Sequence, residues 1–294
     1  MKKCIFKGSG VALVTPFNKN GDINFFELKR LIEFQIVSGT KAIIILGTTG
    51  ESPTITFEER EKIIKFCVSQ VSGRVPLIVG TGSNSTQTAI TLTKQAESLG
   101  ADAALIVSPY YNKSSQRGLF EHYKSIARSS SLPIILYNVP SRTGVNILPQ
   151  TAIKLSKLKT IVGIKEASGN ISQIMELLQT KPHSFKVYSG DDSLTFPLIC
   201  LGASGVISVT ANCYPNDVSN LCDFALKGDF KNALSLHKKL YEINKNLFLE
   251  VNPICIKHYM NLLGRNVGET RLPLTKPAKE TIQKLIKTKG LYET

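Results

Sequence analysis

The chain has 294 residues, of which 42% are hydrophobic and 20% charged, and its formal net charge is +14. It is long enough for a globular core, and no apolar run reaches the roughly 18 residues that a membrane-spanning helix needs. The basic residues are spread along the chain, without a long Lys/Arg block or a nucleic-acid motif. We therefore expect a solvated, lysine-rich surface and no nucleic-acid or membrane partner.

The N-terminal segment, residues 1–10, is basic, and the apolar residues 11–14 that follow are too few for a secretory signal. We interpret this segment as a first strand and expect a cytoplasmic protein. The six cysteines never form Cys-x-x-Cys, and the four histidines do not cluster with them. This pattern favours free buried thiols over a disulfide or a metal site.

Eight apolar, β-branched runs of strand length recur along the chain. Several are apolar throughout, which indicates parallel strands that are buried on both faces. In chain order the runs are 8–17, 41–47, 75–81, 101–108, 132–138, 160–166, 185–189 and 203–209.

Between these runs, apolar residues recur at spacings of three and four, as is typical of helices. Thr56 and Ser85 precede two of these segments as predicted N-caps. Glycines stand where helix ends need a left-handed residue, at Gly39, Gly100 and Gly202. The clearest helical segments are 57–71, 85–99, 116–130 and 172–180.

About eight strand-then-helix units fit before residue 228, which predicts an α/β fold of the (β/α)8, or TIM-barrel, type for residues 1–228. A doubly wound sheet is the alternative, but the Gly-x-Gly-x-x-Gly fingerprint is absent after the first strand. From residue 229 the strand pattern stops, and helical segments follow at 230–248, 253–263 and 276–287. We expect residues 229–294 to form a C-terminal helical appendage, packed on the barrel or on a neighbouring subunit.

Lys165 is the first candidate for chemistry, because a TIM barrel carries its active site at the C-terminal ends of its strands. It follows Ile161-Val-Gly-Ile164 in an otherwise apolar strand. Burial lowers the pKa of a lysine, and a free amine can attack a ketone to give an imine. The alternative is a lysine that extends to solvent from the strand end. Its position between apolar residues favours the nucleophile.

Polar residues also follow other strands. The glycines, amides and hydroxyls of residues 47–52 could hold a carboxylate, although such turns are common without a function. Tyr137 could relay protons and Arg142 could clamp a carboxylate, or they could be a packed tyrosine and a surface arginine. Tyr110-Tyr111 could form an aromatic interface patch, and Gly190-Asp191-Asp192 a simple turn with an N-cap.

Taken together, these segments resemble the pyruvate-dependent class I aldolase superfamily, and within it the 4-hydroxy-tetrahydrodipicolinate synthase (dihydrodipicolinate synthase) family. The resemblance covers essentially the whole chain, with several motifs in the right order at the right strand ends. The motifs are Val14-Thr-Pro-Phe17, Gly47-Thr-Thr-Gly-Glu51, Pro109-Tyr-Tyr-Asn112, Tyr137-Asn-Val-Pro140, Gly163-Ile-Lys-Glu166 and Gly190-Asp191.

The resemblance implies a catalytic set. Lys165 is similar to the lysine that forms a Schiff base with pyruvate, and Tyr137 to the tyrosine that shuttles protons. Thr48 matches the threonine that links this tyrosine to a second one. The second tyrosine corresponds to Tyr111, which this family supplies from the neighbouring subunit of a tight dimer.

It also implies a substrate-binding set. Thr49 matches a residue that binds the pyruvate carboxylate, and Arg142 matches the arginine that receives the carboxylate of the aldehyde substrate. Ile207 matches a residue whose backbone lies beside the catalytic lysine. Gly190 and Asp191 resemble a loop that meets the second substrate.

By resemblance, the reaction is the condensation of pyruvate with L-aspartate 4-semialdehyde to give 4-hydroxy-tetrahydrodipicolinate in lysine and diaminopimelate biosynthesis. The enamine of pyruvate attacks the aldehyde, and the amine of the aldehyde substrate then frees Lys165 and closes the ring. Neither step needs a metal or an organic cofactor. The resemblance further implies a homo-oligomer, a dimer of dimers.

Two alternatives stay open. One keeps the pyruvate lysine but changes the aldehyde, as in an N-acetylneuraminate lyase or a 2-keto-3-deoxy-sugar aldolase. The Ser141-Arg142-Thr143-Gly144 continuation argues against it, because a neutral sugar needs no arginine. The other is a basic barrel that binds nucleic acid without catalysis, which a broken catalytic set would favour.

One departure from the resemblance concerns feedback by lysine. Lysine-inhibited members place histidines and a glutamate at positions where this chain has Phe57, Arg60 and Thr88, although Asn84 and Tyr110 are retained. Without that carboxylate, and with an added cation, an effector that carries an ammonium group should bind poorly. We therefore predict weak or absent feedback.

Overall fold

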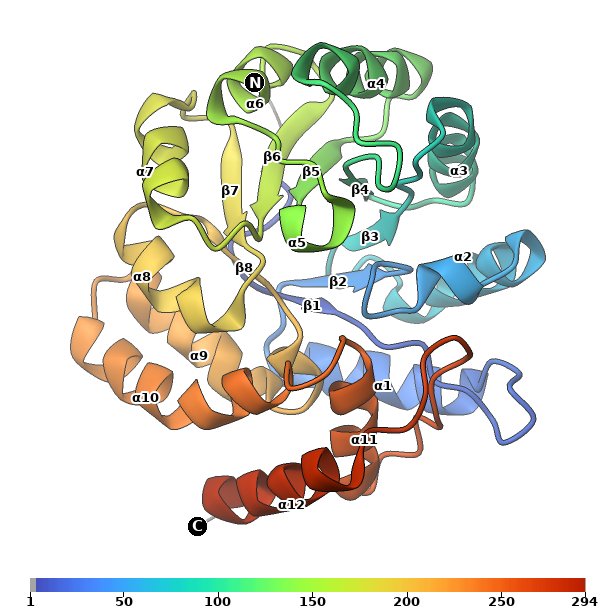
Figure 1. Ribbon diagram of the computed structural model, residues 1–294, viewed down its shortest axis with the longest axis vertical. Helices are drawn as coiled ribbons and strands as arrows, with labels where there is room; N and C mark the ends of the chain where they lie inside the picture. The colour runs from blue at the N-terminus through green and yellow to red at the C-terminus, as the bar shows by residue number, and fades with distance from the viewer. Residues whose placement is uncertain (1–3, 294) are drawn as a thin grey trace.

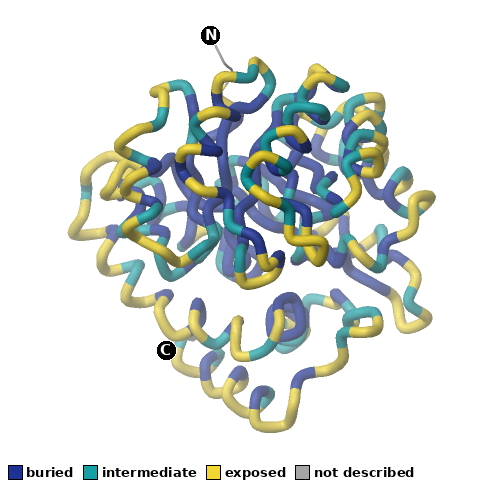
Figure 2. The backbone as a smooth tube through the Cα atoms, turned by 45° about the horizontal axis from the view of Figure 1, so that its top comes forward, coloured by how far each residue is buried: buried dark blue, intermediate teal, exposed yellow. Residues whose placement is uncertain are grey.

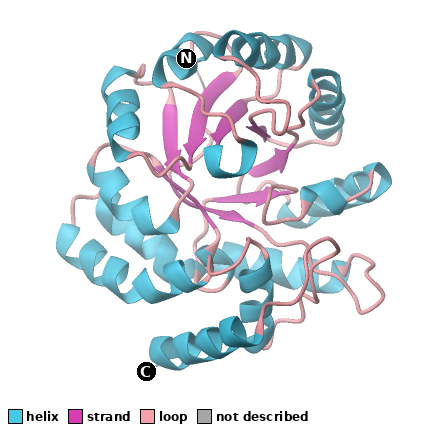
Figure 3. Ribbon diagram, in the orientation of Figure 1, coloured by secondary structure: helices cyan, strands magenta, loops and turns pink. Residues whose placement is uncertain are grey.

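The computed structural model describes residues 4–293, and in it eight parallel strands close into a barrel in the order β1 to β8 (Figure 1). Helices surround the barrel (Figure 3). The predicted α/β fold of the TIM-barrel type is therefore confirmed. The strands are β1 (Gly8–Ala12), β2 (Ala42–Ile45), β3 (Leu77–Gly80), β4 (Ala103–Val107), β5 (Ile134–Asn138), β6 (Ile161–Glu166), β7 (Lys186–Ser189) and β8 (Gly205–Ser208).

Each of the eight strands lies within its predicted run and is shorter than the run. The largest difference is at β1, which ends at Ala12, whereas the apolar pattern continues to Phe17. Leu13, Val14 and Phe17 are nevertheless buried. Their burial accounts for an apolar pattern that extends past the end of the strand.

The long helices that were predicted begin and end close to their predicted positions, except that the last one, predicted at 276–287, spans Lys279–Glu293. Thr56 forms a capping box with Glu59, Ser85 accepts a hydrogen bond from the amide of Thr88, and the three predicted glycines have φ between 87° and 103°. The helices are α1 (Phe25–Val37), α2 (Phe57–Val71), α3 (Thr86–Ser98), α4 (Gln116–Ser129), α5 (Pro140–Thr143), α6 (Pro149–Leu155), α7 (Ile171–Thr180), α8 (Thr195–Cys200), α9 (Pro215–Leu226), α10 (Phe230–Asn246), α11 (Ile254–Leu262) and α12 (Lys279–Glu293).

The core has two large parts, one between the strands and the helices and one inside the barrel, and a small third cluster of Ile174, Leu198 and Ala203. Figure 2 shows that buried residues follow the strands, whereas the outer faces of the helices are exposed. The segment before β1 also enters the interior. There the ring of Phe6 stacks on that of Tyr188 at 4.3 Å between centroids, and the Tyr188 hydroxyl donates to the carbonyl of Phe6 at 2.8 Å. The barrel is thus packed at its N-terminal end.

Helices α10, α11 and α12 follow the last barrel helix, α9. Helix α10 packs against α9, and α12 packs against α10 and α11. The division of the chain after residue 228 stays a prediction. Within residues 4–293, no helix is both long and apolar enough to cross a bilayer.

The prediction of buried thiols is correct for four cysteines, whereas two others are exposed. Cys4 lies before the first strand, and Cys200 ends α8, where a helix terminus meets solvent. The buried ones are Cys67, Cys213, Cys222 and Cys255.

Candidate active site

Lys165 lies on β6 inside the barrel, between Tyr137 of β5 and Tyr188 of β7 in the strand register. Paired residues of neighbouring parallel strands point to the same face, so these three side chains share the interior. The side chain of Lys165 is only 5% exposed, and its Nζ lies 4.4 Å from the centroid of the Tyr137 ring. The predicted amine and phenol are therefore adjacent.

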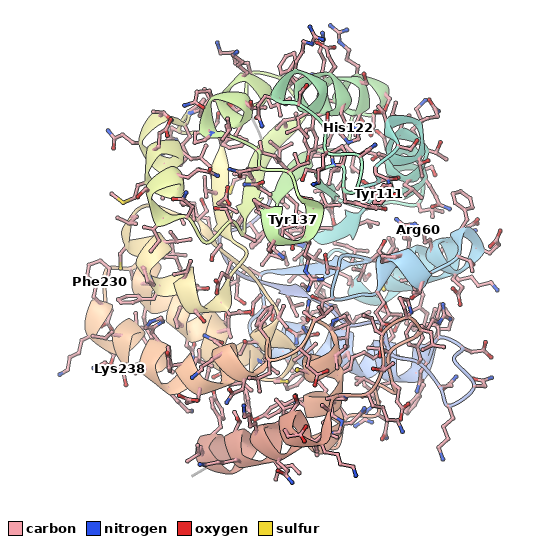
Figure 4. The ribbon with its side chains drawn as sticks, in the orientation of Figure 1. Arg60, Tyr111, His122, Tyr137, Phe230 and Lys238 are labelled. Carbon is pink, nitrogen blue, oxygen red and sulfur yellow. The ribbon has the colours of Figure 1, made fainter. Side chains whose placement is uncertain are left out.

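A cavity of about 530 Å³ reaches Tyr137, which Figure 4 labels near the centre of the barrel, whereas Lys165, Thr49, Gly190 and Ile207 are not among the described residues that line it. Its wall is mostly apolar, which suits a site that binds small molecules through a few polar groups. The polar side chains in this wall that belong to predicted site residues are those of Thr48, Tyr137 and Arg142.

The loop after β2, residues 47–52, places Thr48 in the cavity wall. The loop packs against the backbone at the end of β2 and is bonded to C-terminal residues. Gly50 fits against the backbone of Leu46, since a Cβ would lie 3.0 Å from its nitrogen. Glu51 adopts a left-handed conformation with φ 56°. Its buried carboxylate accepts from Lys257 Nζ at 2.8 Å and from the amide of Arg271 at 2.9 Å. The loop is thereby attached to the C-terminal helices.

Thr49 and Arg142 are linked through one residue that the sequence pattern did not indicate, Asn252. Its side-chain amide donates to Thr49 Oγ1 at 2.9 Å, and its main-chain carbonyl accepts from Arg142 Nη2 at 3.1 Å. Asn252 lies between α10 and α11, is 5% exposed and lines the cavity. The only signal in the sequence is the dipeptide Asn252-Pro253, which lies between the predicted helical segments 230–248 and 253–263.

The loop after β7 touches the lysine. A Cβ at Gly190 would lie 3.0 Å from Lys165 Cε and 2.6 Å from Ala167 Cβ, so only glycine fits without displacement. Asp191 instead caps a short 3-10 helix, with its carboxylate accepting from the amide of Ser193 at 2.9 Å. Asp191 is thus an N-cap, as one of the two interpretations of Gly190-Asp191-Asp192 expected. It is not among the described residues that line the cavity.

Ile207 and Tyr111 lie at opposite extremes of exposure. Ile207 on β8 is buried in the interior cluster with Tyr137 and Tyr188. Tyr111 is 90% exposed, with φ 72°, and it is not among the described residues of the cavity wall (Figure 4). Within a single chain, the structure therefore does not bring Tyr111 to Tyr137.

A buried hydrogen-bond network lies next to Lys165 and Tyr137 and was also missed. Asn138 and Glu166 follow Tyr137 and Lys165 directly and are paired in register. The amide of Asn138 donates to both Glu166 carboxylate oxygens, at 3.2 and 3.0 Å, and the backbone amide of Ser168 donates at 2.7 Å. Burial raises the pKa of Glu166. The network holds the ends of β5 and β6 together.

The cavity extends past Thr48 towards the residues that we associated with feedback. Phe57, Arg60, Thr88 and Tyr110 all line it. Arg60 is buried and donates to Ser52 Oγ at 3.1 Å and to the Gly80 carbonyl at 2.7 Å (Figure 4). Burial lowers the pKa of Arg60 to about 10, so at neutral pH it is a cation in this arm of the cavity.

The sequence of the chain matches the model of the dihydrodipicolinate synthetase family over residues 5–289. A relative from Clostridium novyi (strain NT), named 4-hydroxy-tetrahydrodipicolinate synthase, is 50% identical over 270 residues, which make up 92% of this chain and 91% of the relative.

Solved structures agree with this match. The crystal structure of dihydrodipicolinate synthase from Aquifex aeolicus superposes with a TM-score of 0.95 at 48% identity and covers 98% of both chains. A structure described as the first monomeric dihydrodipicolinate synthase variant gives a TM-score of 0.96 at 44% identity, covering 98% of this chain and 97% of that chain.

Proposed function

Because the chain belongs to the dihydrodipicolinate synthetase family, we propose that Lys165 is the amine through which it acts on pyruvate. The chain condenses pyruvate with L-aspartate 4-semialdehyde to give 4-hydroxy-tetrahydrodipicolinate in lysine and diaminopimelate biosynthesis. It is a lyase of the class I aldolase type. The alternative of a sugar-aldehyde aldolase is not favoured by its relatives.

In the proposed mechanism, Lys165 Nζ attacks the keto carbon of pyruvate, and the adduct loses water to give an imine. Tyr137 protonates the departing hydroxyl. The protonated imine accepts electrons, so the pyruvate methyl group loses a proton and the resulting enamine carbon attacks the aldehyde. The amine of the aldehyde substrate then attacks the imine carbon, which releases Lys165 Nζ and closes the ring.

The observation that carries this proposal is the buried position of Lys165 against Tyr137. Lys165 is 5% exposed, and its Nζ lies 4.4 Å from the centroid of the Tyr137 ring, which lines the cavity, so a small keto acid bound there would lie close to this amine. A structural lysine at this depth would be expected to pair with a carboxylate. Among residues 4–293, Lys165 forms no ion pair.

We assign the two substrate carboxylates to Thr49 and to Arg142, which Asn252 links. Thr49 Oγ1 accepts from Asn252, so its hydroxyl hydrogen stays available to donate to the pyruvate carboxylate. The exposed guanidinium of Arg142 donates one N–H to the Asn252 carbonyl, and its other N–H groups can donate to the carboxylate of the aldehyde substrate. Thr48 is assigned to the proton relay with Tyr137.

The test is borohydride reduction in the presence of pyruvate, followed by peptide mapping. We expect a reduced adduct on the peptide that contains Lys165, and its loss in Lys165→Arg. Lys186→Arg, which changes a lysine on the adjacent strand β7, is the matched control and should be trapped like the wild type. An adduct that persists in Lys165→Arg, or none in the wild type, would overturn the assignment. Product analysis with aspartate semialdehyde against sugar aldehydes then tests the second substrate.

We propose that a second copy of the chain supplies Tyr111, in a homo-oligomer built as a dimer of dimers. Its 90% exposure and its absence from the cavity wall of its own chain support this arrangement. Mixing two inactive variants, Lys165→Arg and Tyr111→Phe, should restore activity, because hybrid dimers contain one site with both residues. No recovery after mixing and subunit exchange would contradict a shared site.

We also propose a cytoplasmic location, and a division into a barrel, residues 1–228, and a helical part, residues 229–294. The location is supported by the biosynthetic enzyme for which the relatives are named and by four buried cysteine thiols. The division is supported by the absence of strands after β8 in the described part of the chain. Fractionation of cells and limited proteolysis test these two proposals.

A further inference from the structure

Two buried polar side chains directly follow the reactive pair at the ends of β5 and β6. Tyr137 pairs with Lys165 in the strand register, and Asn138 pairs with Glu166 one position further on. Successive side chains of a strand point to opposite faces, so Asn138 and Glu166 lie on the outer face of the barrel wall while Lys165 points inside. Glu166 is 1% exposed and Asn138 is fully buried. Only the backbone of the two strands separates them from the reactive pair.

The carboxylate of Glu166 is held by neutral donors. In the described part of the chain, no lysine, arginine or histidine forms an ion pair with it. Its hydrogen bonds come from the side-chain amide of Asn138 and the main-chain amide of Ser168. Taking a carboxylate out of water is costly, and a neutral side chain could join two strands at a smaller cost. A buried anion at this position therefore indicates a role beyond strand pairing.

The partners of Asn138 determine how its amide group is oriented. Its Nδ2 donates to Glu166 and, at 2.8 Å, to Asn146 Oδ1, whereas its Oδ1 accepts from the main-chain amide of Ile147 at 2.9 Å. Turning the amide group over would place its oxygen against the Glu166 carboxylate and its NH2 group against the Ile147 N–H. Glu166 thus sets the orientation of Asn138.

The ladder between β5 and β6 is irregular, so its backbone alone does not impose one uniform register. The register shifts between Ile134 and Ile135, near the start of β5. Such a shift changes which side chains of two strands face each other. Among the described residues, the side-chain hydrogen bonds that join β5 to β6 are those between Asn138 and Glu166. They fasten the end of the ladder at which Lys165 lies.

We propose that Glu166 is a positioning residue for Lys165: by orienting Asn138, it holds β6 against β5 so that the Lys165 amine and the Tyr137 phenol keep the separation that imine formation needs. The inference rests on the proposed function. Glu166 touches neither substrate and acts through the backbone of its neighbour. Attack and proton transfer depend steeply on distance, and a displacement of about 1 Å can lower a rate about 100-fold.

The test is Glu166→Gln, which keeps the volume but replaces one acceptor oxygen by an NH2 group that faces the Asn138 amide. The rate of imine formation is measured by quenching with borohydride at increasing times after mixing with pyruvate. We expect this rate to fall about 10-fold to 100-fold. The double variant Glu166→Gln/Asn138→Asp rebuilds the bridge with donor and acceptor exchanged, so most of the rate should return.

Asn146→Ala is the matched control, because it removes the next hydrogen bond of the same network and leaves the bridge intact. It should form the imine at close to the wild-type rate. Urea unfolding reports separately on stability, since a less stable protein loses free energy of unfolding without a slower reaction in its folded molecules. If Glu166→Gln does not fold, the same comparison is made with Glu166→Asp, which shortens the bridge.

Three results would overturn the inference. The first is imine formation at the wild-type rate in Glu166→Gln, and the second is no recovery in the double variant. The third is an equal loss of rate in Asn146→Ala, which would mean that the whole network, and not the bridge, affects Lys165. A wild-type protein that forms no adduct with pyruvate would instead defeat the proposed function itself.

Discussion

The buried ion pair between Glu51 and Lys257 should be needed to stabilise the active-site loop, residues 47–52. Its atoms are 2.8 Å apart, and the two side chains are 1% and 2% exposed. Lys257 Nζ also donates to the carbonyl of Glu269 at 2.7 Å and lies 4.1 Å from the centroid of the Phe17 ring. Lys257→Met keeps a similar volume but removes the charge and its donors.

The expected magnitude follows from what the substitution leaves behind. Without Lys257, the carboxylate of Glu51 stays buried with only the amide of Arg271 as donor, and breaking a buried pair in this way costs about 3–5 kcal/mol. The double variant Glu51→Gln/Lys257→Met also removes the carboxylate, so we expect it within about 1–2 kcal/mol of the wild type. Burial lowers the pKa of Lys257 to about 8 despite its partner, which shows that desolvation of the ammonium group exceeds the attraction of Glu51.

The assay is urea unfolding followed by far-UV circular dichroism, because the chain contains no tryptophan. Lys276→Ala is the matched control: it breaks the exposed pair with Glu269, and exposed pairs contribute at most about 1 kcal/mol. The reasoning is refuted if the single and double variants lose the same free energy of unfolding, since the loss would then come from packing and not from an unpaired carboxylate.

Gly190→Ala puts a methyl group 3.0 Å from Lys165 Cε, so we expect the rate of borohydride trapping to fall about 10-fold to 100-fold. The control is Gly290→Ala, which has open space at its Cβ and should be trapped at the wild-type rate. Equal trapping rates in the two variants would contradict the contact between Gly190 and Lys165. Burial lowers the pKa of His122 to about 4 from its ordinary 6.5, so its stabilising contribution is present above about pH 6.5 and is lost as the pH falls towards 4. The free energy of unfolding falls when the pH is lowered from about 7.5 to about 5, and we expect this fall to be about 2 kcal/mol smaller in His122→Gln than in the wild type. If the fall is the same in both proteins, His122 does not cause it. L-lysine at physiological concentration should leave the initial rate nearly unchanged, because Arg60 adds a cation to the cavity arm; substantial inhibition would refute this prediction.

The features that could be predicted are those with a local pattern. Lys165 was identifiable because a cation interrupts an apolar strand, and Thr56 because a capping residue precedes acids and an amphipathic run. The helical segments named from the sequence do not include α1, α9, α5, α6 or α8, and the last three of these are short. With only four to seven residues each, they give little periodicity to detect.

The contacts that could not be predicted join residues far apart in the chain. Asn252 and Thr49 are 203 positions apart, and Lys257 and Glu51 are 206 apart. No spacing rule relates such pairs, and a lone Asn-Pro dipeptide indicates only a turn. The position of Asp191 shows a different limit, because one Gly-Asp-Asp pattern serves equally well as a helix cap and as a substrate loop.

The stacked rings of Phe6 and Tyr188 fill the N-terminal end of the barrel interior. On the proposed mechanism, we expect both the aldehyde and water to approach the imine on Lys165 from the cavity that Tyr137 lines. While it reacts, the bound aldehyde would therefore exclude water from the imine, so that hydrolysis would not release pyruvate before the condensation. A smaller side chain at Phe6 would be expected to speed the hydrolysis of the pyruvate imine without slowing its formation.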